Sequence, residues 1–392
     1  MRPIIKRLAA IVAIALLGTT LTHVRPAASA DPDAFTPLGV TPLAAAWPVV
    51  GSDGRQHLVY ELRLVNASSL PFVVEAVSAR PAGSRRLLRR WSGDEVARVM
   101  SRLGTREPGP VIEPGAAALL HLTFSVRSRR ALPRRIVHEL HLSNPSGRGP
   151  AAVRQVGGRV PVVRKRAVDL GPPLRGSGWV AADGCCTAER HVRAVLPFGG
   201  GLHIAQRFAI DWEQLDADGR LFTGDKEVLR NWKGYGASVL AVADGVVTAA
   251  VNDRPDQVPG ELPAGLPPNE ADGNGVLLKL GNGRVVMYAH MIPGSVRVEK
   301  GQRVRKGQVI GRLGNSGNSS APHLHMHVVD RSAFLGATGL PYTFERFTVT
   351  GRIASTDAFN TAEETGEPAE MGTVRKGLLR HRLPLDQVVV GW

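Results

Sequence analysis

The chain has 392 residues, of which 43% are hydrophobic, 21% charged and 5% aromatic. This composition excludes a disordered tail and a collagen-like fibre, and two cysteines in a chain of this length exclude a disulfide-stapled miniprotein. The formal net charge of +15 favours anionic partners.

Residues 1–30 have the features of a secretory signal peptide. Three basic residues precede an apolar run at 8–17, and Ala28-Ser29-Ala30 forms a cleavage site of small residues. The run is short for a membrane span, and no later segment offers about 18 uninterrupted apolar residues. We therefore expect an exported mature chain that is secreted, periplasmic or wall-associated and has no stable transmembrane segment; an uncleaved anchor is the alternative.

Export narrows the anionic partners to cell-wall polymers or acidic lipid surfaces. The densest basic cluster consists of Arg85, Arg86, Arg89 and Arg90. No nucleic-acid recognition motif accompanies the charge, so we expect no nucleic acid as a partner. A solvated arginine-rich face without a partner is the competing interpretation.

The two cysteines are adjacent, at Cys185 and Cys186. In an oxidising compartment they could form a vicinal disulfide, pair between chains or stay reduced and buried. The sequence does not choose among these, but a structural role is expected because nothing marks either thiol as an activated nucleophile.

Residues 31–165 are predicted to form a β-sandwich domain. Hydrophobic and polar residues alternate at 57–64, 118–126 and 136–142, and this period of two indicates strands with one buried face. Turn-rich stretches separate the strands, and a helical insert is expected near 93–103. An immunoglobulin-like antiparallel sandwich fits best. We expect three histidines of these strands, His121, His138 and His141, at the surface.

Residues 166–350 are predicted to form a second β-domain, because glycine and proline punctuate many short Val/Ile/Leu runs and no long amphipathic helix is present. The fold class is therefore all-β. Residues 351–392 form a polar C-terminal tail whose end, Val388 to Val390, is a possible edge strand.

Histidines and an aspartate mark the second domain. His323, His325 and His327 alternate along one predicted strand, so that all three project from the same face. His290 ends another strand, and Asp211 lies on a third.

These fragments occur in an order that resembles the lysostaphin/LytM-type zinc endopeptidases, which cut peptidoglycan cross-bridges. The resemblance covers about a third of the chain. The matching stretches are 208–211, 236–247, 288–290, 298–311 and 314–325.

The resemblance implies a LytM-like β-domain of the duplicated hybrid motif type that binds zinc. By it, Asp211 and His325 would ligate the metal, and His290 and His323 would assist the reacting water and stabilise the oxyanion. A zinc ion with three protein ligands lowers the pKa of water to about 7. Neutral imidazoles nearby accept or donate the proton.

The sequence departs from the family pattern His-x-Gly-x-Asp at its first ligand, where Arg207 stands four residues before Asp211. An arginine stays protonated and cannot ligate zinc. We expect both residues on one strand face, so that the guanidinium could pair with Asp211 and occupy the place of the metal; in an active variant it could pair with a substrate carboxylate instead. His327 stands where the family usually has glutamate.

Replacement ligands are possible. A hairpin with its tip at 197–201 would set His191 opposite Arg207. His203 and His327 are further candidates, although His203 is roughly 26 Å from Asp211 along an extended strand. A site with weak metal affinity or none is the remaining alternative.

The sequence thus predicts a secreted, cell-wall-acting zinc metallo-endopeptidase that hydrolyses peptide bonds of peptidoglycan. The alternative is a catalytically inactive LytM-like protein that binds peptidoglycan or regulates a partner wall hydrolase. The bond cut and the oligomeric state are not predicted.

Overall fold

The computed structural model describes residues 34–105 and 107–392, so the predicted signal peptide at 1–30 lies outside the described residues. Phe35–Trp392 form one compact unit. Among the described residues, no helix has the length and apolar character needed to cross a membrane.

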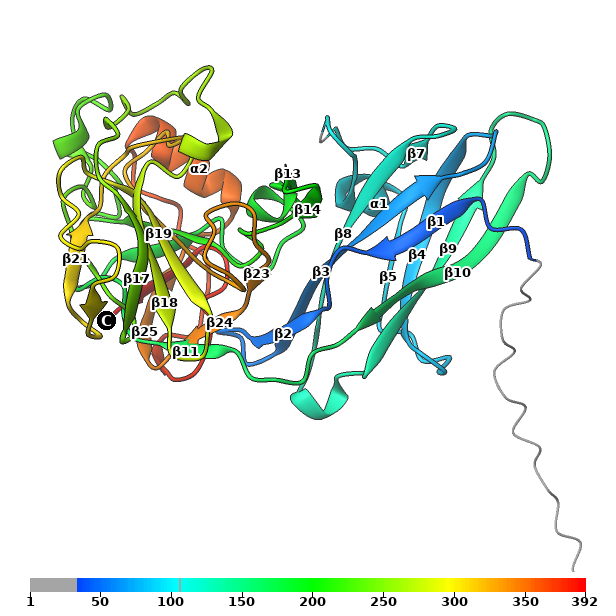
Figure 1. Cartoon of the computed structure of the whole chain (residues 1–392), viewed down its shortest axis with the longest axis horizontal. Helices are drawn as coiled ribbons and strands as arrows, with labels where there is room; N and C mark the ends of the chain where they lie inside the picture. Colours follow the sequence, from blue (N-terminus) through cyan, green and yellow to red (C-terminus); the bar gives the residue numbers. More distant parts are fainter. Residues whose placement is uncertain (1–33, 106) are drawn as a thin grey trace, which may run out of the picture. The chain divides into compact units, whose positions relative to one another are not determined.

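The N-terminal half consists of two antiparallel sheets (Figure 1). The first contains β1 (Leu38–Pro42), β2 (Trp47–Val50), β3 (Gln56–Asn66), β6 (Met100–Arg102) and β8 (Ala117–Val126). The second contains β4 (Phe72–Pro81), β5 (Arg89–Ser92), β7 (Val111–Ile112), β9 (Arg135–Ser143) and β10 (Ala152–Pro161). The alternating segments are strands as predicted, and the helical insert is α1 (Asp94–Val99). The immunoglobulin-like assignment and the domain boundary at 165 stay predictions.

The two faces of β3 serve different parts of the unit. Leu58, Tyr60 and Leu62 pack into the core between the two N-terminal sheets. Val59, on the opposite face, belongs to the core of the C-terminal half, and Glu61 is fully buried on that face. The period of two along this strand therefore builds a sandwich and also covers the second half.

Two histidines of the sandwich are buried, so their predicted surface position is wrong. His138 is fully buried between the Tyr60 hydroxyl and the Gly158 carbonyl, both 2.8 Å away. His121 is 2% exposed and lies 3.2 Å from the Ser101 hydroxyl. Each ring is tolerated in the interior because a polar partner from another segment meets it.

The C-terminal half is built on an antiparallel sheet that has eleven strands within the described residues. Its main path runs β20-β17-β18-β19-β22-β15-β12-β27-β25-β26. The strands are β12 (Trp179–Ala182), β15 (Ile210–Gln214), β17 (Gly245–Val251), β18 (Asn274–Leu280), β19 (Val285–Met291), β20 (Arg303–Val304), β22 (Leu324–Val329), β23 (Gly339–Leu340), β25 (Phe347–Arg352), β26 (Gly377–Leu379) and β27 (Val388–Gly391).

Shorter elements complete this half. Two-stranded pairs join β11 (Val168–Leu170) to β24 (Tyr342–Phe344), β13 (Leu196–Phe198) to β14 (Gly201–His203) and β16 (Ser238–Leu240) to β21 (Val309–Arg312). Its helical elements are α2 (Thr356–Thr365) and the 3-10 turns η2 (Arg190–Arg193), η3 (Leu229–Asn231) and η4 (Pro268–Glu270), whereas η1 (Arg129–Ala131) lies in the N-terminal half.

The C-terminal residues are part of this sheet. β27 pairs with β12 on one side and with β25 on the other, so it is an interior strand and not the edge strand predicted. Before it, α2 is capped at its N-terminus by Ser355, whose side chain accepts a hydrogen bond from the Ala358 amide at 3.0 Å. Gly366 closes its C-terminus at φ 70°, a conformation that glycine adopts without steric cost.

Candidate metal centre

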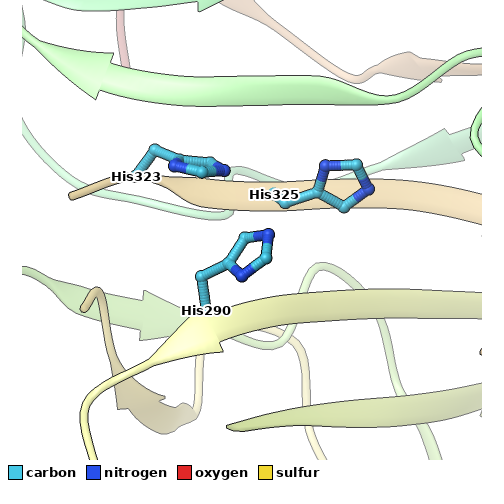
Figure 2. Close-up of side chains that lie close together, drawn as sticks. All are labelled: His290, His323 and His325. Atoms are coloured by element: carbon cyan, nitrogen blue, oxygen red, sulfur yellow. The ribbon is translucent and has the colours of Figure 1, made fainter. Parts of the chain in front are cut away.

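Strand register brings the predicted ligands together. Asp211 of β15 is the direct antiparallel partner of His325 on β22. On its other side, His325 pairs with Ala289 of β19, and His290 follows that residue. Figure 2 shows the ring of His290 directed from β19 toward His323 and His325, which lie at the start of β22.

Three imidazoles surround the Asp211 carboxylate. Nδ1 of His325 is 2.7 Å from Oδ1 of Asp211, and Nε2 of His191 is 3.2 Å from Oδ2. Nε2 of His323 is 3.6 Å from Oδ1. All of these side chains are buried or nearly so, which strengthens their electrostatic interactions.

The Arg207 guanidinium does not bind the Asp211 carboxylate. The prediction that it shares a strand face with Asp211 is wrong, because Arg207 lies in a turn before β15 begins at Ile210. Its guanidinium donates to Glu61 of β3, with Nη2 to Oε2 at 2.6 Å and Nε to Oε1 at 2.9 Å. Nη1 donates to the Gly339 carbonyl at 3.0 Å. The buried Glu61 carboxylate thus binds the Arg207 guanidinium, which therefore does not take the place of the metal beside Asp211.

His191 reaches the centre by a route other than the hairpin. The hairpin of β13 and β14 is short and pairs Leu196 with His203, so His191 never becomes a strand partner of Arg207. His191 instead lies in η2, and its Nδ1 is 3.0 Å from the Asp183 carbonyl. A carbonyl only accepts, so Nδ1 carries the proton and Nε2 is directed at Asp211.

The loop before η2 contains Cys185 and Cys186, which form a vicinal disulfide. Cys185 is buried in the core, and its carbonyl accepts a hydrogen bond from the Asp386 amide at 2.8 Å. The side chain of Asp386 in turn accepts from the Gly184 amide at 3.0 Å. These bonds attach the loop that carries His191 to the β27 end of the sheet.

His327 lies behind the centre and not in it. Its Nδ1 is 2.9 Å from Nε2 of His325, and within the described residues its own Nε2 has no hydrogen-bond partner. A cation held by Nδ1 of His325 requires the proton of that ring on Nε2, which then donates to His327. With a cation bound, His327 would therefore accept from Nε2 of His325 and hold that ring in the tautomer that presents Nδ1.

His290 and His323 have a matching arrangement. Nδ1 of His290 is 2.7 Å from the Ser316 carbonyl, and Nδ1 of His323 is 2.7 Å from the Ala321 carbonyl. Both Nδ1 atoms must donate, which leaves both Nε2 atoms as acceptors. The two rings lie 4.6 Å apart, so a pair of proton acceptors adjoins the Asp211 carboxylate.

The backbone at His290 is held in an unusual conformation, with φ at 60°. The His290 amide donates to the Asp272 carbonyl at 3.1 Å, and its carbonyl accepts from the Gly314 amide at 3.0 Å. Gly273, at φ 60°, passes so close to Ser316 that a side chain there would collide with it. Such strain costs about 1–3 kcal/mol and persists where surrounding contacts enforce it, which is common at functional sites.

Burial and charge set the protonation states. Burial by itself would lower the pKa of His191, but the Asp211 carboxylate outweighs burial and raises it to about 9. Burial would raise the pKa of Asp211, but the neighbouring imidazoles hold it well below its usual range. Burial lowers the pKa of His325, and that of His290 falls further. A metal ion entering the centre must therefore displace a proton from His191.

The donor set fits a zinc ion. Within the described chain, two groups of possible ligands have all their donor atoms within 4.8 Å of one another: His191, Asp211 and His325, and His290, His323 and His325. The first group combines imidazole nitrogens with a carboxylate, which is a donor set that zinc accepts. His203 is in neither group.

Comparison with known proteins matches one segment of the C-terminal half to a protein family. Residues 232–335 match Peptidase family M23. The chain carries an M23 peptidase domain. The matched residues include His290, His323, His325 and His327, whereas Asp211 and His191 precede them.

A curated relative of the M23 domain is the peptidoglycan DD-endopeptidase ShyA of Vibrio cholerae serotype O1, which is 41% identical over 59 residues. That match covers 15% of this chain and 13% of the relative. Two similar solved structures are the catalytic domain of lysostaphin from Staphylococcus simulans and a zinc-containing peptidase from Vibrio cholerae. The first is 22% identical with a TM-score of 0.23 and covers 41% of this chain and 84% of that one. The second is 14% identical with a TM-score of 0.23 and covers 74% and 83%.

The structure also reveals acidic side chains near the centre that sequence reasoning missed. Glu213 lies two residues after Asp211 on β15, and Glu363 comes from α2. The signal for Glu213 was present, because alternate residues of a strand share a face. No local sequence pattern indicated Glu363, because its helix is more than 100 residues away from Asp211 along the chain.

Proposed function

We propose that this chain is an exported zinc-dependent endopeptidase that cleaves peptide bonds of peptidoglycan. The observation that supports it most directly is the convergence of His191, Asp211 and His325 while Arg207 is bound to Glu61. The M23 domain, and its similarity to a peptidoglycan DD-endopeptidase, support the class of substrate.

In this proposal His191, Asp211 and His325 hold the metal. A bound zinc ion supplies Lewis acidity and lowers the pKa of water to about 7. Asp211 stays anionic because its pKa lies well below its usual range, so it keeps a full charge for the cation at neutral pH. His327 keeps the ring of His325 in the tautomer that presents Nδ1.

His290 and His323 handle the proton. Their Nδ1 atoms are committed to the carbonyls of Ser316 and Ala321, so their Nε2 atoms accept a proton from the attacking water and return it to the leaving amine. The low pKa of His290 keeps its ring neutral before the reaction begins. The same rings, once protonated, donate to the developing oxyanion.

We further propose that the sandwich at 31–165 positions or tethers the M23 domain on the wall. The net charge of the mature chain, +11 after the four basic residues of 1–30 are subtracted from +15, suits attachment to anionic wall polymers.

A second candidate function is a catalytically inactive M23 protein that binds peptidoglycan or regulates a partner hydrolase. One observation favours it: the protonated His191 and the Asp211 carboxylate form an ion pair that neutralises the centre without a metal. The choice between the two functions rests on whether zinc displaces that proton.

The test is the zinc content of the purified mature chain, measured by elemental analysis beside variants His191→Ala and His325→Ala. We expect about one zinc per chain in the parent and a loss of zinc in both variants. His203→Ala removes an imidazole outside both ligand groups and serves as the matched control, with zinc retained. Absence of zinc from the parent after incubation with the ion would favour the binding protein.

Catalysis is tested on purified peptidoglycan by the release of new amino termini. His290→Ala and His323→Ala should keep zinc and lose roughly 10²- to 10⁴-fold in rate, the usual contribution of a proton-transfer group. Zinc-loaded parent protein that releases no amino termini would refute the endopeptidase.

A further inference from the structure

A small acidic cavity adjoins the metal centre. Its volume is about 80 Å³, and its walls include Asp211 and His323 together with side chains outside the proposed ligand set. The charged and polar members of that second group are Asp183, Arg190, Glu213, Ser320, Asn360 and Glu363.

The fold brings these groups together from distant segments. Asp211 and Glu213 alternate along β15 and therefore project from the same face. Asn360 and Glu363 are three residues apart on α2, which places them on one side of the helix. The two caps of α2, at Ser355 and Gly366, define the length of the helix that carries them.

The acids of the cavity are only partly compensated. Nε of Arg190 is 3.2 Å from Oδ1 of Asp183, and its Nη2 donates to Asn360 at 2.7 Å. The Arg190 guanidinium therefore compensates the charge of the Asp183 carboxylate. Glu213 is 4% exposed, and its Oε2 has no hydrogen-bond partner within the described residues. A buried carboxyl group without a partner costs free energy unless a ligand supplies a donor.

The spacing of the acids decides which cation fits. Within the described residues, Asp183, Glu213 and Glu363 do not form a group whose ligand atoms all lie within 4.8 Å, whereas two such groups occur at the metal centre itself. A divalent ion needs ligand oxygens at about 2.0–2.6 Å from it, so three separated carboxyls do not chelate one. An ammonium group, with three donors, bonds to acceptors that are spread around it.

We propose that the acidic cavity binds a primary ammonium group of the peptidoglycan peptide, beside the bond that the metal centre cuts. The proposal rests on the proposed function and narrows its substrate to stem peptides with a free amino group. The cavity has room for a few water molecules, which suits an ammonium group with its adjoining methylene and excludes a sugar ring. Glu213 and Glu363 accept its hydrogen bonds.

The test compares two forms of one insoluble peptidoglycan preparation, either native or with its free amino groups acetylated. The mature zinc-treated chain is mixed with each, and binding is measured by co-sedimentation and cleavage by the release of new termini. We expect about tenfold tighter binding to the native form, since a hydrogen bond to a charged group is worth about 1.5–3 kcal/mol. This preference opposes bulk electrostatics, because acetylation makes the wall more anionic and the mature chain is cationic, with a net charge of +11 once the four basic residues of 1–30 are subtracted from +15.

Two variants on α2 separate the cavity from the surface. Glu363→Gln removes a cavity carboxylate, and the preference for native peptidoglycan should fall at least threefold. Glu364→Gln removes the neighbouring carboxylate, which is 76% exposed and paired with Lys226, and should keep the parent preference.

Each outcome bears on the proposal separately from the endopeptidase. Equal binding to both forms, or an undiminished preference in Glu363→Gln, overturns the ammonium site even if peptidoglycan is cut. A preference that depends on Glu363 but comes without zinc or cleavage supports the site and removes the endopeptidase.

Discussion

The buried ion pair between Arg207 and Glu61 leads to a quantitative prediction. Arg207 is 4% exposed and Glu61 fully buried, and their atoms make contacts of 2.6, 2.9 and 3.2 Å. Replacing Arg207 by methionine leaves Glu61 without its partner in the interior. Breaking such a pair from one side costs about 3–5 kcal/mol, whereas removing both charges together is often neutral. We therefore expect Arg207→Met to lose about 3–5 kcal/mol of unfolding free energy.

The assay is urea unfolding followed by tryptophan fluorescence, with chelator present so that metal binding does not contribute. The double variant Glu61→Leu, Arg207→Met should recover most of the loss. Zinc content should be unchanged in Arg207→Met once the metal is restored, because the guanidinium points away from Asp211. A loss below about 1 kcal/mol, or a gain of zinc on removing the guanidinium, would refute this account.

Three further outcomes are expected. Burial lowers the pKa of His138 from 6.5 to about 4, so the unfolded chain binds more protons than the folded chain between these values. About 3 kcal/mol of stability, present above pH 6.5, is therefore lost as the pH falls to 4. Acid titration should show a shallower loss in His138→Gln and the parent loss in the control His203→Gln. His327→Ala should weaken zinc affinity about 10- to 100-fold in a competitive chelator titration, with His327→Asn recovering part of it, since the ring only orients His325; unchanged affinity would contradict that role. Chelation of zinc should lower the unfolding temperature of the parent, because a ligand at 1,000 times its Kd adds about 4 kcal/mol to the free energy of unfolding. The unfolding temperature of His191→Ala should not change, because this variant lacks a proposed metal ligand.

The local alternation of apolar and polar residues was sufficient to predict the strands and to place the histidines of β22 on one face. Alternation predicted β3, β8 and β9, because the period of two reflects burial on one face regardless of what covers it. The same rule placed His325 and His327 on one strand, whereas His323 lies one residue before β22 begins. All-β architecture followed from short apolar runs and turns, which are properties of neighbouring residues.

Partners from distant segments were decided only in the tertiary structure. Glu61 is 146 residues from Arg207 and His138 is 78 residues from Tyr60, so no local pattern indicates that either polar group is buried and satisfied. The hairpin rule failed for His191 because pairing stops at Leu196, and a 3-10 turn delivers the ring instead. Alternation specifies which face a side chain takes, whereas the long-range register of strands and the packing of loops specify what it meets there.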